Sequence, residues 1–82
     1  MNEEIAQLRD EIDAVDSLIA HLLYERVEIS RRIVALRKRD GGEPIDRMRV
    51  LQVNSGYIDI LRNASSTDDV LDLVGAIMRV CR

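Results

Sequence analysis

The sequence predicts an all-α protein with three helices per chain, one long and two shorter. Its 82 residues are enough for a single domain, which we place at residues 1–82. The chain is 46% hydrophobic and 33% charged, as in soluble folded proteins. It contains no Trp, no Phe and two Tyr, so the aromatic residues that favour strands are scarce. Apolar residues recur instead at helical spacing, and a sandwich or barrel is not expected.

Residues 3–39 are predicted to form the long helix, since neither Gly nor Pro interrupts them. Their apolar residues alternate in steps of three and four, except where one member is skipped, which is the a/d pattern of a helix that packs along another helix. We call this set the apolar seam: Ile5, Leu8, Ile12, Val15, Ile19, Leu22, Ile29, Ile33 and Leu36. Asn2 is the expected N-cap, and Asp40-Gly41-Gly42 is the expected end of the helix.

The length of this helix predicts a homodimer. At ~1.5 Å per residue the helix is roughly 55 Å long, whereas a compact chain of this size is only about 30 Å across. The remaining residues are too few to cover the apolar seam. A second copy of the chain packed along it is therefore the expected solution.

Two shorter helices are expected after the long one. The second begins near Pro44 and carries Met48, Leu51, Ile58 and Leu61 on its apolar face, with a kink or a break open at Asn54-Ser55-Gly56. Asn63-Ala64-Ser65-Ser66 is expected as a loop. Ser66 and Asp69 approximate a capping box before a third helix, whose apolar face is Val70, Leu73, Val74, Ile77 and Cys81.

One residue breaks the apolar seam. Arg26 occupies a position where the spacing calls for a hydrophobic residue, and no acidic residue lies three or four positions away. A buried unpaired charge costs several kcal/mol, so the guanidinium needs a partner or partial exposure. Two explanations stay open: a carboxylate from another helix or from a partner chain, or an anionic ligand bound inside the bundle.

Arg37 follows Arg26 by 11 residues, which is three helical turns and ~20° of rotation. We call Arg26, Ser30, Ile33 and Arg37 the cationic row. Taken alone, Arg37 fits a solvated basic helix end equally well. Arg9 lies ~25 Å from Arg26 along the helix, so the two reach one ligand only if an antiparallel partner, centred near residues 17 and 18, supplies Arg9.

Other chemistry is not indicated. Asp46 and Arg49 have the spacing of a local ion pair, and His21 is expected at the surface. No nucleophile with an adjacent base, no Cys/His metal cluster and no glycine-rich phosphate loop is visible, so we expect neither metal nor other cofactor. Cys81 has no disulfide partner. Without an apolar run of ~20 residues or a signal peptide, the expected location is the cytoplasm.

Four stretches resemble the all-helical chorismate mutases of the AroQ class. They are Leu8–Asp13 (LRDEID), Leu22–Arg26 (LLYER), Ile33–Arg37 (IVALR) and Pro44–Arg49 (PIDRMR). The resemblance implies an intertwined homodimer with two shared sites, in which chorismate rearranges to prephenate on the shikimate pathway of aromatic amino acid biosynthesis. It implies substrate contacts from Arg9 of one chain and from Arg26, Arg37, Asp46 and Arg49 of the other, with Arg26 and Arg37 catalytic.

The sequence departs from that family at the site. Arg37 stands where Lys is usual, Val50 where Glu contacts the substrate hydroxyl, and Cys81 where Ser is frequent. The family's late Gln would fall beyond Arg82. The resemblance also implies that a complex with a shikimate-pathway enzyme can activate short members.

Competing functions stay open. On the same fold, Val50 is compatible with a 4-amino-4-deoxychorismate mutase or an isochorismate pyruvate lyase. A non-catalytic dimerisation or regulatory module is a further alternative. Binding of nucleic acid through the basic stretch 31–39 is disfavoured by the net charge of −3 and the lack of stacking aromatic residues.

Overall fold

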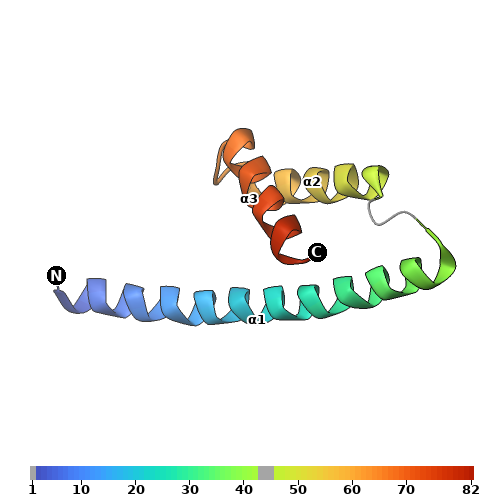
Figure 1. Ribbon diagram of the computed structural model, residues 1–82. Coiled ribbons are helices and arrows are strands. Elements are labelled where there is room, and N and C mark those ends of the chain that lie inside the picture. Colours follow the sequence, from blue (N-terminus) through green and yellow to red (C-terminus); the bar gives the residue numbers. More distant parts are fainter. Residues whose placement is uncertain (1, 43–45) are drawn as a thin grey trace.

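A computed structural model describes residues 2–42 and 46–82. It contains the long helix α1 (Asn2–Asp40) and two shorter helices, α2 (Arg47–Leu61) and α3 (Thr67–Val80), and the described ranges hold no strand. The all-α prediction of one long and two shorter helices is therefore confirmed. Figure 1 shows α1 running along the whole molecule, with α2 above it and α3 descending from the end of α2 to the middle of α1.

The end of α1 is fixed by two glycines, as the sequence indicates. Gly41 has a φ of +76°, a conformation that residues with a Cβ rarely adopt. The amide of Gly42 donates to the carbonyl of Arg37 at 2.8 Å, and that of Gly41 donates to Lys38 at 3.4 Å. This is a Schellman motif, which satisfies carbonyls in the last turn of the helix. At the other end, Asn2 is itself the first helical residue rather than a preceding cap.

The start of α2 is formed by an N-cap that the sequence analysis did not predict. The helix begins at Arg47 after the N-cap Asp46, whose carboxylate accepts a hydrogen bond from the backbone amide of Arg49 at 3.2 Å. The predicted start at Pro44 lies outside the described residues. Asn54, Ser55 and Gly56 do not break the helix, which continues to Leu61.

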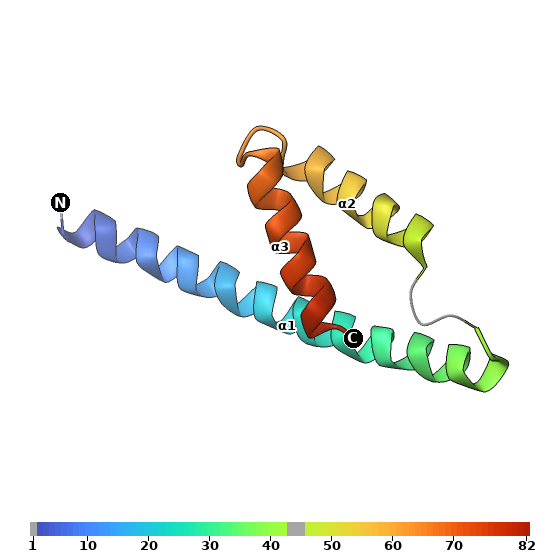
Figure 2. The same cartoon turned by 45° about the horizontal axis from the view of Figure 1, so that its top comes forward.

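The third helix follows the sequence prediction closely. Ser66 is its N-cap and accepts a hydrogen bond from the amide of Asp69 at 3.2 Å. The buried side chains of the described chain all lie on or directly after this helix: Val70, Val74, Ile77 and Cys81. Leu73, which was predicted on the same face, is 47% exposed because it lies at the edge of that face. This small core packs α3 against α2 and brings the end of α3 to α1 (Figure 2).

The apolar seam of α1 is uncovered. Its residues are between 48% and 58% exposed, and α1 contains no buried residue. The chain measures 59 × 25 × 15 Å with a radius of gyration of 16.5 Å, against about 12 Å for a compact chain of this length. The predicted overhang of the long helix is thus confirmed, and a large apolar surface remains without a partner in a single chain.

The described helices include none that is both long enough and apolar enough to cross a membrane.

Candidate active site

The cationic row lies at the border between the uncovered seam and the part of α1 that meets α3. Arg26, Ser30 and Arg37 are half-buried, whereas Ile33 is 48% exposed. Leu23, Val27 and Val34 on the adjoining stripe of α1 are also half-buried. The row therefore faces neither bulk water nor a closed core, which is a suitable position for cations that bind a ligand between helices.

Arg26 meets α3 through a sulfur atom. Its Nη2 donates to Sδ of Met78 at 3.7 Å, and both side chains are half-buried. Within residues 2–42 and 46–82, no carboxylate pairs with Arg26. A carboxylate from another helix of the same chain is thus not observed beside Arg26 in these residues. The Arg26 side chain is partly exposed, so a carboxylate from a partner chain or from a ligand can still reach it.

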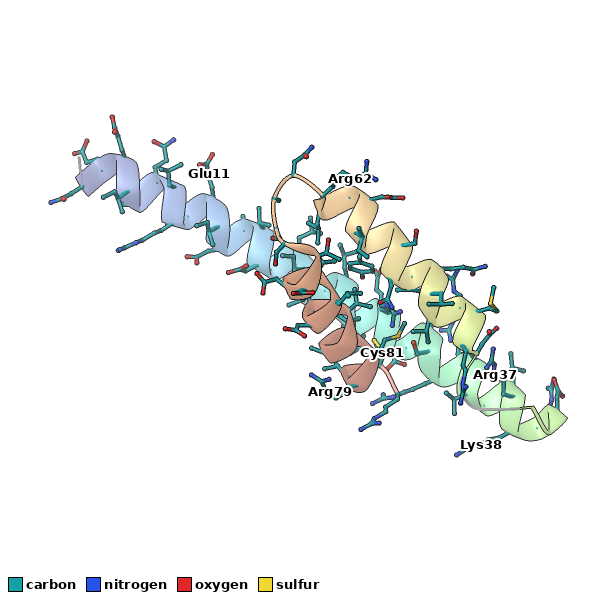
Figure 3. All side chains as sticks on the ribbon, turned by 90° about the horizontal axis from the view of Figure 1, so that it is seen from above. Glu11, Arg37, Lys38, Arg62, Arg79 and Cys81 are labelled. Carbon is teal, nitrogen blue, oxygen red and sulfur yellow. The ribbon has the colours of Figure 1, made fainter. Side chains whose placement is uncertain are left out.

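Arg37 is held differently. Its Nη2 lies 3.7 Å from Oδ2 of Asp46, the residue that caps α2, and their side chains are 32% and 46% exposed. Figure 3 shows Arg37 on α1 close to the start of α2. The structure thus brings two predicted site residues together across the turn between helices. It also corrects the expected Asp46–Arg49 ion pair, because Asp46 bonds the backbone of Arg49 while that guanidinium donates to Gln52 at 3.3 Å.

The remaining predicted site residues lie on or at the end of three different helices. Val50 is half-buried on α2, and Cys81 is 3% exposed at the C-cap of α3. Arg9 is exposed on the first half of α1, ~25 Å along the helix from Arg26. Met78 was not predicted as a site residue from the sequence. Its position four residues after Val74, on the inner side of α3, was the signal that could have indicated it.

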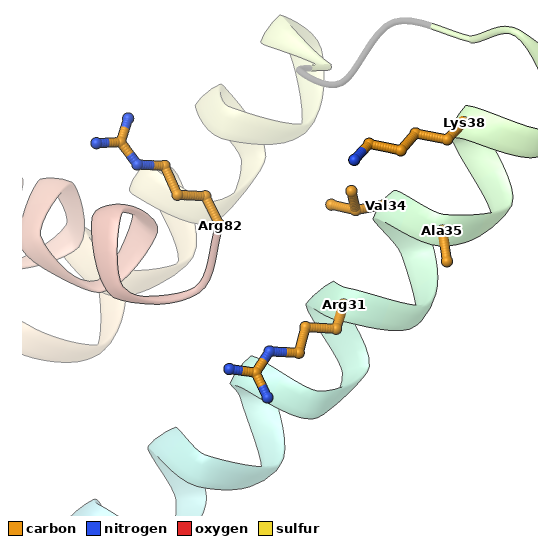
Figure 4. Close-up of a pocket in the computed structure, with 5 residues that line it drawn as sticks. All are labelled: Arg31, Val34, Ala35, Lys38 and Arg82. Atoms are coloured by element: carbon orange, nitrogen blue, oxygen red, sulfur yellow. The ribbon is translucent and has the colours of Figure 1, made fainter.

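A second basic surface lies on another side of α1. An open hollow of about 330 Å³ is lined by Arg31, Val34, Ala35, Lys38 and Arg82 (Figure 4). Arg31 already pairs with Glu28 at 3.0 Å. Arg31 and Lys38 are rotated by roughly 100–140° from the cationic row, so this hollow is not a continuation of it.

No group of three or more His, Cys, Asp or Glu residues able to hold a metal ion occurs in the part of the chain that the structure describes. The charged groups of the site are guanidinium groups and the Asp46 carboxylate, which bind or orient anions and hydroxyl groups. Fold and site together define a helical chain suited to a small anion held by arginines.

Comparison with known proteins identifies the family. Residues 8–82 match the family described as chorismate mutase type II, and the chain belongs to this family. A curated relative is the intracellular chorismate mutase of Mycolicibacterium smegmatis (strain ATCC 700084 / mc(2)155), 38% identical over 58 residues. The match covers 71% of this chain and 56% of the relative, so the chain matches just over half the length of that protein. No solved structure matches.

Proposed function

We propose that the chain is a chorismate mutase, an isomerase that converts chorismate to prephenate in a site shared by two chains. The observation that carries this proposal is Arg26, a half-buried cation at a position of the apolar seam, for which the described chain supplies no carboxylate. A ligand with carboxylates would satisfy it, and the family membership supports chorismate, which is a dianion. The half-buried Arg37 lies three turns further along the same row.

A homodimer with antiparallel α1 helices is part of this proposal. The uncovered seam supports it, and so does the charge distribution along α1. Residues 2–20 contain six acidic side chains (Glu3, Glu4, Asp10, Glu11, Asp13 and Asp16) against Arg9. Residues 21–39 contain six basic ones (Arg26, Arg31, Arg32, Arg37, Lys38 and Arg39) against Glu25 and Glu28. Antiparallel pairing places the acidic half of one helix along the basic half of the other.

The seam itself supports a centre near residue 17. Ile12 and Leu22 are equally far from that residue, as are Val15 and Ile19. In this register the position opposite Arg26 is Leu8, and Arg9 is its neighbour. Arg9 of the partner would then complete the site, which is the composition that the resemblance implies.

The proposed role of the protein is to hold the substrate and to stabilise charge. The rearrangement is intramolecular: a C–O bond breaks while a C–C bond forms, so no nucleophile or redox group is required. Arg26 and the partner's Arg9 bind the two carboxylates in a compact reactive conformer, which can lower the barrier by several kcal/mol. Arg37 donates to the ether oxygen, where negative charge develops as the C–O bond breaks.

Asp46 has two parts in this proposal. Its carboxylate lies beside the Arg37 guanidinium and caps α2, so it fixes the start of that helix relative to α1. In the proposed complex Asp46 and Arg49 shape the side of the site that receives the substrate hydroxyl. The buried Cys81 at the end of α3 and the half-buried Val50 in the first turn of α2 supply contacts of lower polarity.

The apolar Val50 supports a second candidate on the same fold. A side chain without a carboxylate removes a partner for the substrate hydroxyl, as expected for 4-amino-4-deoxychorismate or for isochorismate. A non-catalytic helical module is the candidate from another class. We further propose that the protein acts in the cytoplasm in aromatic amino acid biosynthesis, alone or in complex with a shikimate-pathway enzyme.

The deciding experiment is a side-by-side assay of the purified protein with chorismate, 4-amino-4-deoxychorismate and isochorismate, with the product identified as prephenate, its amino analogue or pyruvate. We expect the highest kcat/KM with chorismate. A much higher kcat/KM with either rival would reassign the substrate, and no turnover of any of the three would favour the non-catalytic module.

A further inference from the structure

The contact between Arg26 and Met78 joins the proposed site to the last turn of α3. The distance from Nη2 to Sδ is 3.7 Å, within the range of a weak hydrogen bond to sulfur. The two residues are 52 positions apart in sequence and lie on different helices, so this contact is part of how α3 meets α1.

A thioether is an unusual partner for a guanidinium in this molecule. Arg31, Arg37 and Arg62 each pair with a carboxylate, at 3.0, 3.7 and 2.7 Å. Such a carboxylate neutralises the cation and competes with any anionic ligand. A thioether carries no charge and is a weak acceptor, so Arg26 keeps its full positive charge and its capacity for strong hydrogen bonds.

The same contact restricts the Arg26 side chain. A free Arg side chain samples many rotamers, and a ligand that binds it must remove part of that freedom. Packing of the guanidinium against a half-buried methionine removes some of that freedom before the ligand arrives. Preorganisation of this kind raises affinity without adding a contact to the ligand.

We propose that Met78 is a positioning residue that orients Arg26 for an anionic substrate while leaving its charge unneutralised. This inference rests on the proposed function. It assigns to position 78 a requirement for a side chain that is long, apolar and free of negative charge. The requirement concerns substrate affinity rather than the stability of the fold.

Three substitutions separate these properties: Met78→Leu keeps an apolar side chain, Met78→Gln adds an uncharged acceptor, and Met78→Glu adds a carboxylate of similar length. We expect Met78→Leu to stay within about 3-fold of the wild-type KM for chorismate. Met78→Glu should raise KM by about 10- to 100-fold, since its carboxylate pairs with Arg26 and must be displaced. Its melting temperature should stay equal or rise, because the new pair stabilises the fold. Val80→Glu, at a 62% exposed position in the same turn, is the matched control and should leave KM unchanged.

The outcomes distinguish this inference from the proposed function. A wild-type protein without turnover refutes the proposed function itself. With an active wild-type protein, equal KM values for Met78→Glu and Met78→Leu would overturn the role of Met78, as would a loss of melting temperature that accounts for the whole effect. If circular dichroism shows Met78→Glu to be unfolded, Met78→Gln decides. A KM several-fold above that of Met78→Leu supports the inference, and equal values refute it.

Discussion

At the scale of single residues, Arg26 departs most clearly from its surroundings. The sequence alone marks it, because the step of the apolar seam falls on a charged residue. Its sulfur contact could not be predicted, since that depends on how α3 crosses α1. The Arg37–Asp46 contact likewise requires the turn between two helices, and spacing suggested instead a local pair of Asp46 with Arg49.

Substitution of Arg26 tests its role as a carboxylate ligand. Arg26→Ala should lower kcat/KM by about 10²- to 10³-fold or more, since charge stabilisation in a half-buried site is lost. Arg26→Lys should recover only part of this, because an ammonium lacks the two parallel donors of a guanidinium. Arg62→Ala, which breaks an exposed pair with Asp59, is the control and should retain activity. Full activity of Arg26→Ala with chorismate would contradict the assignment.

Two substitutions separate the two roles of Asp46, the N-cap of α2 and the ion pair with Arg37. Asp46→Asn keeps an N-cap acceptor but removes the charge beside Arg37, a partly exposed pair worth under about 1 kcal/mol. Asp46→Ala loses the cap as well and should cost about 1 kcal/mol of stability. Urea unfolding at one protein concentration should therefore rank Asp46→Asn close to wild type and Asp46→Ala below it. Equal losses for both variants would show that the ion pair, not the cap, stabilises the start of α2.

At the scale of elements, the spacing of the apolar residues predicted that the helices exist, and the capping residues predicted where they end. The Gly41-Gly42 stop of α1 and the Ser66 cap of α3 were predictable, because their side chains, or the lack of one, fix local backbone geometry. The middle of α2 was ambiguous in sequence. Asn54, Ser55 and Gly56 lower helix propensity, yet the helix continues through them, and packing of α2 on α3 offsets that local cost.

The glycine at position 41 gives a prediction for the end of α1. Gly41→Ala forces a residue with a Cβ into the left-handed region and should cost about 1–2 kcal/mol of stability. Gly42→Ala is the matched control. An added Cβ there would lie 3.8 Å from the carbonyl oxygen of Arg37, which is ordinary van der Waals contact. Thermal unfolding at a fixed protein concentration compares the two, and an equal loss for both would argue against the Schellman end.

At the scale of the whole molecule, the long exposed helix determines the assembly that we propose. Sequence length and periodicity predicted that α1 would extend beyond the rest of its chain, and the dimensions of the molecule, 59 × 25 × 15 Å, agree. How a second chain would cover α1 depends on contacts between two copies, and a single chain does not contain those contacts. The charge polarity of α1 and the symmetry of the seam about residue 17 favour antiparallel pairing.

A charge placed in the seam tests this assembly. Ile19→Lys puts an ammonium near the proposed centre of the interface, where Ile19 is 49% exposed in the single chain. Burial of that charge against a partner is unfavourable, so sedimentation should show loss of the dimer. Ser17→Lys, roughly 160° away around the same helix, should stay dimeric. Dimers of equal stability for both variants would place the interface elsewhere.

The shared site is tested most directly by combining two inactive chains. Arg9→Ala and Arg26→Ala each damage both sites of a homodimer. A heterodimer of the two, purified through different affinity tags, contains one site with both arginines intact and one with neither. We expect this heterodimer to recover about half of the wild-type turnover per dimer, because one of two equivalent sites is native. A stable heterodimer with no more activity than either parent would show that Arg9 and Arg26 of different chains do not form one site.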